Sequence, residues 1–333
     1  MFISMPTVWR SHQWRSEVEA WVQDVLSEQG IGVTGAVDQP RVRSWSTQLV
    51  VPTTEGRMWF KENHPAQRAE AAVIEVIAGL APEQVVVPVA VQRRRGWLLS
   101  RDQGPTLAAE ERTDEALWAR LTVEFAGLQR RLAGHRAELA AAGLAALPPV
   151  DVAGSVERQV AVMRAMPQDS AVHIDAALAG RALAALPALR ATAARLEATA
   201  ALTSLDHNDL HLNNVFARPP GGSALRFFDF GDALWAHPFT SLSVPVGSMC
   251  ADWEVEPSDP RVLRVVDAYL EVWSDIAGRA PLREAAALAM AFGPVNRFES
   301  WRRLVADSSA SEAPEGAQAV RRWLGQVADT PYP

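Results

Sequence analysis

The chain of 333 residues contains one cysteine, Cys250, and one lysine, Lys61. A single cysteine excludes an intramolecular disulfide framework and favours a reducing compartment. No stretch approaches the length of an apolar helix that spans a membrane, and the N-terminus lacks the basic and apolar segments of a secretion signal. We therefore expect a cytoplasmic protein that has no membrane partner.

An excess of positive charge is also absent. The net charge is −7 and no lysine-rich tract is present, so the chain lacks the electrostatic features with which proteins bind nucleic acid. With 48% hydrophobic residues, it has ample apolar material for the cores of two lobes with a cleft between them. The composition predicts a globular enzyme or binding protein and leaves its oligomeric state open.

Two clusters of polar residues are the most informative part of the sequence. Residues 207–214 read His-Asn-Asp-Leu-His-Leu-Asn-Asn, and an Asp-Phe-Gly triplet begins at Asp229. This order supplies the acid/base and the two metal ligands of kinase-type phosphoryl transfer. Asp209 is the carboxylate that orients an attacking hydroxyl, while Asn214 and Asp229 offer oxygen ligands to Mg²⁺.

The residues between the two clusters predict a β-hairpin. Apolar segments at 215–217 and 225–228 flank a Pro-Pro-Gly-Gly turn at 219–222. Because a hairpin brings its two ends together, we expect Asn214 and Asp229 to face each other across a gap that fits a metal ion.

These residues resemble the aminoglycoside phosphotransferase and choline kinase family, whose loop typically reads His-Gly-Asp-Leu-His-x-x-Asn. The second histidine, His211, is the distinguishing mark, since protein kinases usually have lysine there. The resemblance is strong around the two clusters and traceable over most of the chain. It implies an α+β, protein-kinase-like fold of two lobes, with a small antiparallel-sheet N-lobe at 1–102 and a larger helical C-lobe at 103–333.

The resemblance also implies functional roles. Asp209 is then the catalytic base, Asn214 and Asp229 are the Mg²⁺ ligands, and ATP or GTP is the phosphoryl donor. A zinc site is an alternative for the His-x-Asp-x-His run, because imidazole and carboxylate groups both bind zinc. That alternative leaves Asn214 and the Asp-Phe-Gly triplet unexplained.

The remaining polar residues of this region receive structural assignments. Within the kinase hypothesis, we expect His207 and His211 each to hold the loop by a hydrogen bond to a backbone carbonyl. Asp206 and Asp232 lie outside the motif positions and are expected at the surface or in a hinge. Ser241 stands where aspartate is common in the family, so one contact of the helical lobe is expected to be altered.

The sole lysine lies where a kinase needs one. Segments 47–53 and 57–61 predict two strands of a hairpin, and Lys61 ends the second strand. In kinases, such a lysine contacts the α- and β-phosphates and pairs with a glutamate of the next helix. That helix is predicted over 66–80, with Glu70 on its inward face as the chosen partner and Glu75 as the second choice. The alternative is an exposed lysine at a strand edge.

The turn before this hairpin departs from the protein-kinase pattern. Residues 43–48 have none of the glycines of a Gly-x-Gly-x-x-Gly loop. Ser44, Ser46 and Thr47 can instead offer hydroxyl and backbone donors to phosphate. We include Ser46 among the nucleotide-binding candidates.

A hinge is predicted after two further strands. It contains Arg101 and Asp102, which we add to the nucleotide-binding candidates because the backbone of this segment holds the purine ring in the resembling family. Beyond the hinge, apolar residues at helical spacing follow a cap at 113 or 114, and the alanine-rich segment 176–200 predicts further helical structure.

The acceptor side of the site is less specific. In the resembling family, acceptor pockets are built mainly from C-terminal helices. Segments 252–256 and 296–301 combine carboxylates with aromatic side chains, which suits a cationic or polyhydroxylated small molecule. The same mixture is expected of surface helices with aromatic core residues, and we assign none of these residues to the site.

The sequence therefore predicts a kinase that transfers the γ-phosphoryl group of ATP or GTP to a hydroxyl of a small molecule, an aminoglycoside-like or other hydroxylated antibiotic. A metabolic kinase for a sugar or amino alcohol is the alternative of the same class. A nucleotide-binding regulatory protein without turnover is the alternative of another class. The presence of Lys61, Asp209, Asn214 and Asp229 together favours an enzyme.

Overall fold

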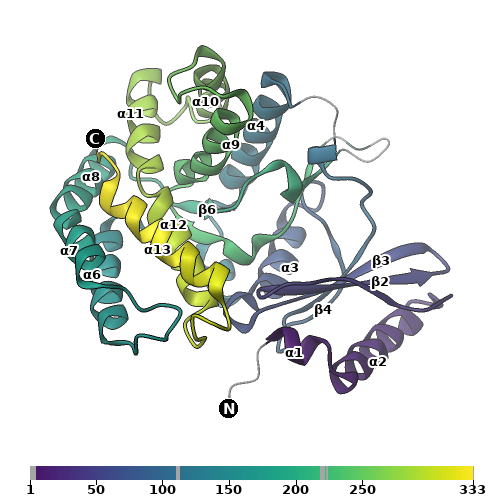
Figure 1. Ribbon diagram of the computed structural model, residues 1–333. Coiled ribbons are helices and arrows are strands. Elements are labelled where there is room, and N and C mark those ends of the chain that lie inside the picture. The colour runs from purple at the N-terminus through teal and green to yellow at the C-terminus, as the bar shows by residue number, and fades with distance from the viewer. Residues whose placement is uncertain (1–4, 110–112, 218–221, 223, 333) are drawn as a thin grey trace.

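The computed structural model of the chain has a sheet at one end and a larger body of helices at the other (Figure 1). It describes residues 5–109, 113–217, 222 and 224–332. This α+β arrangement confirms the predicted fold class. No helix in those ranges is long and apolar enough to cross a membrane.

The sheet has five antiparallel strands in the order β1-β2-β3-β5-β4. The strands are β1 (Asp38–Val42), β2 (Ser46–Thr53), β3 (Gly56–Asn63), β4 (Pro88–Gln92) and β5 (Trp97–Arg101). The predicted hairpin is β2–β3, in which Thr53 pairs with Gly56. Lys61 lies in the central strand, between Gln48 of β2 and Leu98 of β5.

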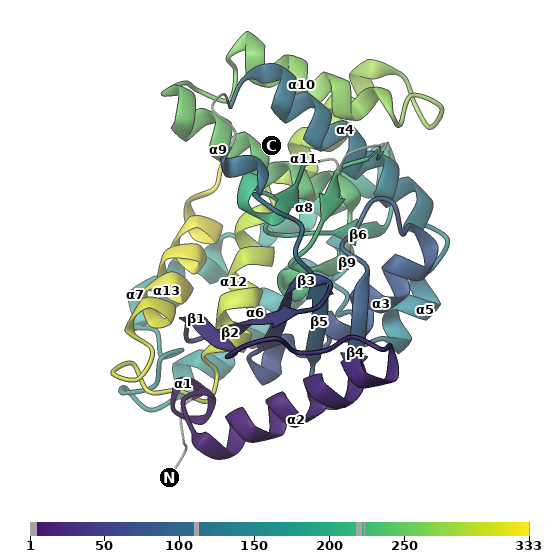
Figure 2. The same cartoon turned by 90° about the vertical axis from the view of Figure 1, so that its right-hand side faces the viewer.

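Helix α2 (His12–Glu28) covers one face of this sheet (Figure 2). Its buried residues recur every four positions, at Trp14, Val18, Val22 and Leu26, which is the spacing of one helical face. They form a separate core with inward-facing strand residues such as Phe60. The short helix α1 (Met5–Trp9) precedes α2, and the side chain of Ser11 caps α2.

Helix α3 (Glu70–Leu80) contacts β4 on one side and α4 and α5 on the other. The prediction that this helix starts at residue 66 is wrong by four residues. Pro65–Gln67 form a 3-10 turn, in which the His64 side chain accepts a hydrogen bond from the backbone N–H of Ala66. This local bond stabilises a tight turn before the helix begins.

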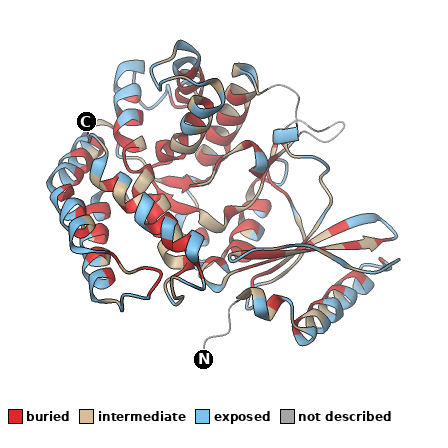
Figure 3. Cartoon of the chain, in the orientation of Figure 1, coloured by how far each residue is buried: buried red, intermediate tan, exposed pale blue. Residues whose placement is uncertain are grey.

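The second part of the molecule is mainly helical. Its buried residues lie on the inward sides of the helices, where they form one core (Figure 3). Its helices are α4 (Glu115–Leu132), α5 (Arg136–Ala141), α6 (Pro149–Ala165), α7 (Ala176–Ala184), α8 (Leu186–Thr199), α9 (Ser243–Trp253), α10 (Pro260–Glu271), α11 (Arg279–Met290), α12 (Gly293–Leu304) and α13 (Pro314–Asp329). Asp114 caps α4, as predicted.

The alanine-rich segment 176–200 is helical, as predicted, and forms two helices. Helix α7 ends at Ala184 and α8 begins at Leu186, with Pro187 in its first turn. Proline lacks a backbone N–H and fits the start of a helix but not its interior. Pro187 therefore suits the place where the second of these helices begins.

Short strands frame the two polar clusters. Strand β6 (Ser204–Asp206) pairs with β9 (Leu234–Ala236), and β7 (Val215–Phe216) pairs with β8 (Arg226–Phe227). The predicted hairpin is confirmed in its strands, while residues 219–221 of its turn lie outside the described part of the chain. Phe227 also exchanges backbone hydrogen bonds with the segment that leads into β4, donating to Gln84 (2.8 Å) and accepting from Val86 (3.2 Å).

Candidate active site

Asp209 lies in the loop that leaves β6 and receives contacts on both carboxylate oxygens. Arg297 Nη1 is 2.9 Å from Oδ1. Asn214 Nδ2 and His211 Nε2 are 3.3 and 3.4 Å from Oδ2. Burial alone would raise the pKa of Asp209, but the hydrogen bond from His211 and the charge of Arg297 hold this pKa well below its usual range. Asp209 is therefore ionised and able to accept a hydrogen bond from a hydroxyl.

Asn208 gives this loop its shape. Its φ is 60°, a left-handed conformation in which asparagine is tolerated better than most residues other than glycine. Its side-chain amide contacts the backbone oxygens of Asp232 (3.2 Å) and Asn296 (3.0 Å) and the hydroxyl of Ser300 (3.2 Å). The loop is thus connected directly to helix α12.

Lys61 forms the ion pair predicted with Glu70. Its Nζ is 2.9 and 2.7 Å from the two Glu70 oxygens and 2.7 Å from Asp229 Oδ1. Only 12% of the lysine side chain is exposed, so the alternative of an exposed lysine is wrong. The second-choice partner, Glu75, instead pairs with Arg93 at the surface (2.7 Å). Burial opposes the charge on Lys61, but Asp229 and Glu70 outweigh it and raise the pKa of the ammonium.

Glu70 also fixes the Asp-Phe-Gly triplet. Its Oε1 accepts a hydrogen bond from the backbone N–H of Phe230 (3.1 Å). Asp229, just before it, has φ 64° and ψ 57°, a left-handed conformation that turns its carboxylate back toward Lys61. At Gly231, an added Cβ would lie 2.9 Å from Asn63 Nδ2. A side chain at this position would therefore push against the Asn63 amide, which is hydrogen-bonded to Glu70.

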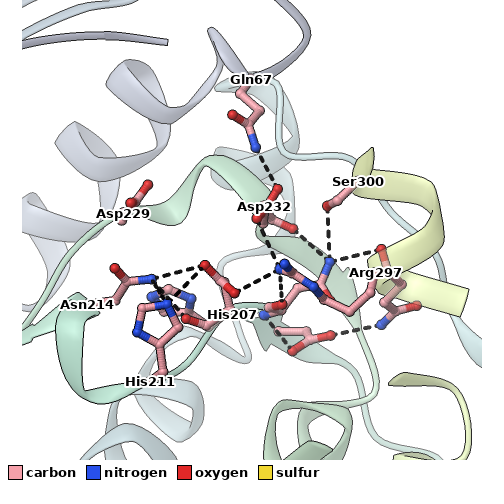
Figure 4. Close-up of polar contacts among 12 residues, drawn as sticks. Gln67, His207, His211, Asn214, Asp229, Asp232, Arg297 and Ser300 are labelled. Carbon is pink, nitrogen blue, oxygen red and sulfur yellow. Dashed lines mark hydrogen bonds and ion pairs between the residues drawn. The ribbon is translucent and has the colours of Figure 1, made fainter. Parts of the chain in front are cut away.

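The arrangement of Asn214 and Asp229 suits a Mg²⁺ ion. The amide nitrogen of Asn214 donates a hydrogen bond to the backbone oxygen of Asp209, at 2.9 Å. This turns the amide oxygen the other way, to the side on which Asp229 lies (Figure 4). A neutral oxygen and a carboxylate are ligands that Mg²⁺ accepts, with phosphate oxygens and water at its other positions.

The histidines do not form a metal site with Asp209. His207 is buried, and its Nε2 donates to the backbone oxygen of Phe228 (3.0 Å), as predicted; burial lowers its pKa. His211 differs from the prediction, because its Nδ1 accepts from the backbone N–H of Asn213 and its Nε2 faces Asp209. Across the described ranges, no group of three or more histidine, cysteine or carboxylate side chains is placed to hold a metal ion.

The side chains of three further nucleotide-binding candidates are buried or paired. Ser46 is buried at the first position of β2. Arg101 pairs with Glu55 (2.6 Å) and Asp102 with Arg57 (2.7 Å). The last two side chains thus contact the β2–β3 turn, and only their backbone remains a candidate for contact with a purine. The hydroxyl of Thr47, considered with Ser46, donates to the backbone oxygen of Arg41 (3.0 Å).

Asp206 and Asp232 do not occupy the expected surface or hinge positions. Asp206 is fully buried and accepts hydrogen bonds from Ser241 Oγ (2.7 Å) and Asn296 Nδ2 (2.8 Å). Burial raises its pKa. Asp232 accepts from Gln67 Nε2 (2.5 Å) and pairs with Arg297 (3.1 Å). Asp206 also accepts a hydrogen bond from the backbone N–H of Asn208, next to Asp209 in the catalytic loop. Ser241, which replaces the aspartate common in the family, contributes by donating to Asp206.

Helix α12 contains the residues that the sequence did not identify. The expectation of a surface helix at 296–301 is wrong for one face, since Asn296 and Ser300 are buried and Arg297 reaches Asp209. The sequence signal was weak: Asn296 and Ser300 are four positions apart, which places two small polar residues on one helical face. Nothing local indicates that this face meets the catalytic loop.

The sequence matches a known protein family over most of its length. The sequence model of the phosphotransferase enzyme family matches residues 41–284. The chain belongs to this family. The predicted kinship and the prediction of a phosphotransferase are thereby confirmed. No curated protein matches the chain.

Solved structures with the same fold come from several branches. A macrolide 2'-phosphotransferase from Brachybacterium faecium, MphH, has 17% identity over 90% of this chain and 97% of its own, with a TM-score of 0.56. The ethanolamine kinase of Plasmodium vivax has 11% identity over 97% and 90%, with a TM-score of 0.62. The choline kinase LicA from Streptococcus pneumoniae has 13% identity over 94% and 99%, with a TM-score of 0.58. At these identities, the likeness establishes the shared fold and leaves the acceptor open.

Proposed function

We propose that the chain is a small-molecule kinase that transfers the γ-phosphoryl group of ATP or GTP to a hydroxyl of an antibiotic. The observation that carries the proposal is the position of Lys61, 2.7 Å from both Glu70 and Asp229. This contact brings Lys61, the proposed phosphate-binding cation, next to Asp229, the proposed metal ligand. Phosphoryl transfer requires both groups near the triphosphate. A division into lobes after residue 102, with the cleft between them, is part of the proposal.

Each residue has a separate task in this mechanism. Lys61, held by Glu70, binds the α- and β-phosphates. Asn214 and Asp229 hold Mg²⁺, which neutralises charge on the triphosphate when it is bound. Asp209 accepts the hydrogen bond of the acceptor hydroxyl and aligns its oxygen with the γ-phosphorus. Ser46 and the backbone of Arg101 and Asp102 complete the nucleotide site.

A nucleotide donor is supported by a relative of the same fold. The structure of a spectinomycin phosphotransferase, in complex with ADP and spectinomycin, has 10% identity over 93% of this chain and 97% of its own, with a TM-score of 0.51. ATP is therefore the first donor to test, and GTP the second.

A cavity lies beside helix α12, and its lining does not include Lys61, Asp209, Asn214 or Asp229. It has a volume of about 400 Å³ and lies between the β1–β2 turn and the end of α12. Its walls include Trp45 and Trp301, and its rim includes Asp307 and Glu312. Aromatic faces with nearby carboxylates suit a large hydroxylated molecule that carries an amine. A metabolic kinase remains the alternative, because choline and ethanolamine kinases share the fold.

Expression in a drug-sensitive bacterial host tests the proposal. We expect resistance to at least one hydroxylated antibiotic, with a phosphate added to the drug by mass spectrometry. Asp209→Asn should abolish both effects, whereas the matched control Asp275→Asn, which removes a surface carboxylate paired with Arg130, should preserve them.

Three other outcomes contradict the proposal in different ways. A phosphate added only to a sugar or amino alcohol in a purified assay indicates a metabolic kinase. Resistance without a modified drug indicates sequestration. Nucleotide binding without transfer to any acceptor indicates the regulatory alternative.

A further inference from the structure

We propose that Arg297 is a positioning residue for phosphoryl transfer, which holds the Asp209 carboxylate in the orientation that receives the acceptor hydroxyl. The inference rests on the proposed function. Arg297 belongs to α12 and lies beyond residues 41–284, which the family model matches. The family match therefore assigns no role to this helix.

The guanidinium is held in one place. Its Nη1 is 2.9 Å from Asp209 Oδ1, 3.1 Å from Asp232 Oδ2 and 2.8 Å from the backbone oxygen of Asn208. Only 12% of the side chain is exposed. The ring of Trp323 on α13 lies 5.8 Å from its Cζ. A cation that donates hydrogen bonds to two oxygens, pairs with a third and has an aromatic neighbour has little freedom to move.

Arg297 and the catalytic loop contact different oxygens of the Asp209 carboxylate. Arg297 contacts Oδ1, while Asn214 and His211 contact Oδ2 at 3.3 and 3.4 Å. With each oxygen fixed by a different partner, rotation about the bond that carries the carboxylate is opposed. The unused lone pairs then have a defined direction in which to accept a hydroxyl proton.

Asp232 fixes Arg297 in turn. One oxygen of Asp232 pairs with Arg297, and the other accepts a hydrogen bond from Gln67 Nε2 at 2.5 Å. Gln67 belongs to the 3-10 turn between β3 and α3. Contacts therefore run from the sheet part of the molecule through Asp232 and Arg297 to Asp209.

Loss of the arginine has a specific consequence. Asp209 and Asp232 share its charge, and without it two carboxylates face each other with no cation between them. Like charges at short range repel, so Asp209 should turn away from the α12 side. A residue that merely tethered α12 would leave the orientation of Asp209 unchanged.

Steady-state kinetics test the effect on turnover. In Arg297→Ala, kcat should fall by about 100-fold while the KM for nucleotide stays within about threefold, because displacement of a catalytic group by about 1 Å costs that much in rate. Arg297→Lys should recover part of kcat, since an ammonium keeps the charge but not the planar fork. Guanidinium ion at millimolar concentration should raise kcat of Arg297→Ala.

The matched control is Arg302→Ala on the same helix. Arg302 pairs with Glu299 at 2.9 Å and is also largely covered, so its loss should disturb α12 to a similar degree. Its kcat should stay near that of the unaltered protein and should not respond to guanidinium. Equal kcat in Arg297→Ala and Arg302→Ala overturns the inference.

Crystal structures of the two variants give a readout that does not depend on turnover. In Arg297→Ala, the Asp209 carboxylate should leave its position, and in Arg302→Ala it should keep it. An unmoved Asp209 in Arg297→Ala overturns the positioning role. If the unaltered protein phosphorylates no acceptor, the proposed function fails, while the position of Asp209 in these crystals still decides the role of Arg297.

Discussion

At Lys61, the shape of the cation matters as much as its charge. The ammonium fits between Glu70 and Asp229, with Nζ–O distances of 2.7 Å to each. A guanidinium is broad and planar and cannot occupy the same point. The contacts of this residue therefore constrain it to lysine in a chain whose other basic residues, histidine aside, are all arginine.

Lys61→Arg should reduce kcat/KM for nucleotide by about 100-fold, because the arginine displaces Glu70 or Asp229 instead of bridging them. Glu70→Gln should reduce it less, since the amide oxygen still accepts one hydrogen bond. Steady-state kinetics at saturating acceptor measure both effects. Arg93→Lys, at the surface pair with Glu75, serves as control. Retention of full activity in Lys61→Arg contradicts the role of Lys61 in the cleft.

Asn208 combines a left-handed backbone with side-chain bonds to α12, and two substitutions separate these contributions. Asn208→Gly keeps the backbone relaxed and loses the bonds. Asn208→Ala loses the bonds and strains the backbone as well, so it should be less stable than the glycine variant by about 1 kcal/mol. Urea denaturation of both variants measures the difference. Equal free energies of unfolding would mean that the φ of 60° carries no cost.

At the level of elements, the parts of the candidate site whose residues lie close together in the sequence could be predicted. Asp209, Asn214 and Asp229 lie on one loop and the hairpin that follows it, and the Lys61–Glu70 pair needs only a strand and the next helix. The face of α12 could not be predicted. Its burial depends on contact between residues 206–209 and 296–300, which no local periodicity reports. The early start predicted for α3 failed for a similar reason, since apolar spacing does not reveal a turn stabilised by His64.

The turn at Pro238–Leu242 should make stability depend on pH through His237. This buried histidine donates from Nε2 to the backbone oxygen of Ala200 (3.1 Å) and accepts at Nδ1 from the backbone N–H of Phe239 (3.2 Å). Burial lowers its pKa from 6.5 to about 4. Between these values, the unfolded chain binds the proton more readily than the folded one, so stability falls as the pH drops through this window, by up to about 3 kcal/mol.

His237→Gln is the control for this effect. A glutamine amide can donate to Ala200 and accept from Phe239 but does not titrate. Urea denaturation between pH 7 and pH 4.5 should therefore show a smaller loss of stability in the variant than in the unaltered protein. The same loss in both proteins would show that His237 is not the group that titrates.

At the level of the whole molecule, an aromatic contact connects the sheet part to the helical part. Trp45 in the β1–β2 turn meets Trp301 on α12 with ring centroids 5.6 Å apart and an interplanar angle of 78°. In the proposed kinase, this turn covers the nucleotide phosphates. The contact therefore helps to fix the position of this turn relative to α12.

Trp301→Ala should weaken nucleotide binding by about fivefold, because an edge-to-face aromatic pair contributes about 1 kcal/mol. Trp301→Phe keeps an aromatic ring and should lose less. Isothermal titration calorimetry with a Mg-nucleotide compares the two. Identical affinities for the alanine and phenylalanine variants would show that the contact does not influence nucleotide binding.

The single lysine also determines how the protein can be handled. Amine-reactive reagents attack the unprotonated form of an amine, and Lys61 is buried, paired with two carboxylates and protonated over the whole neutral range. The α-amino group is then the one reactive amine. Immobilisation through amines should tether every molecule at the same point of the chain, with the cleft untouched by the coupling chemistry.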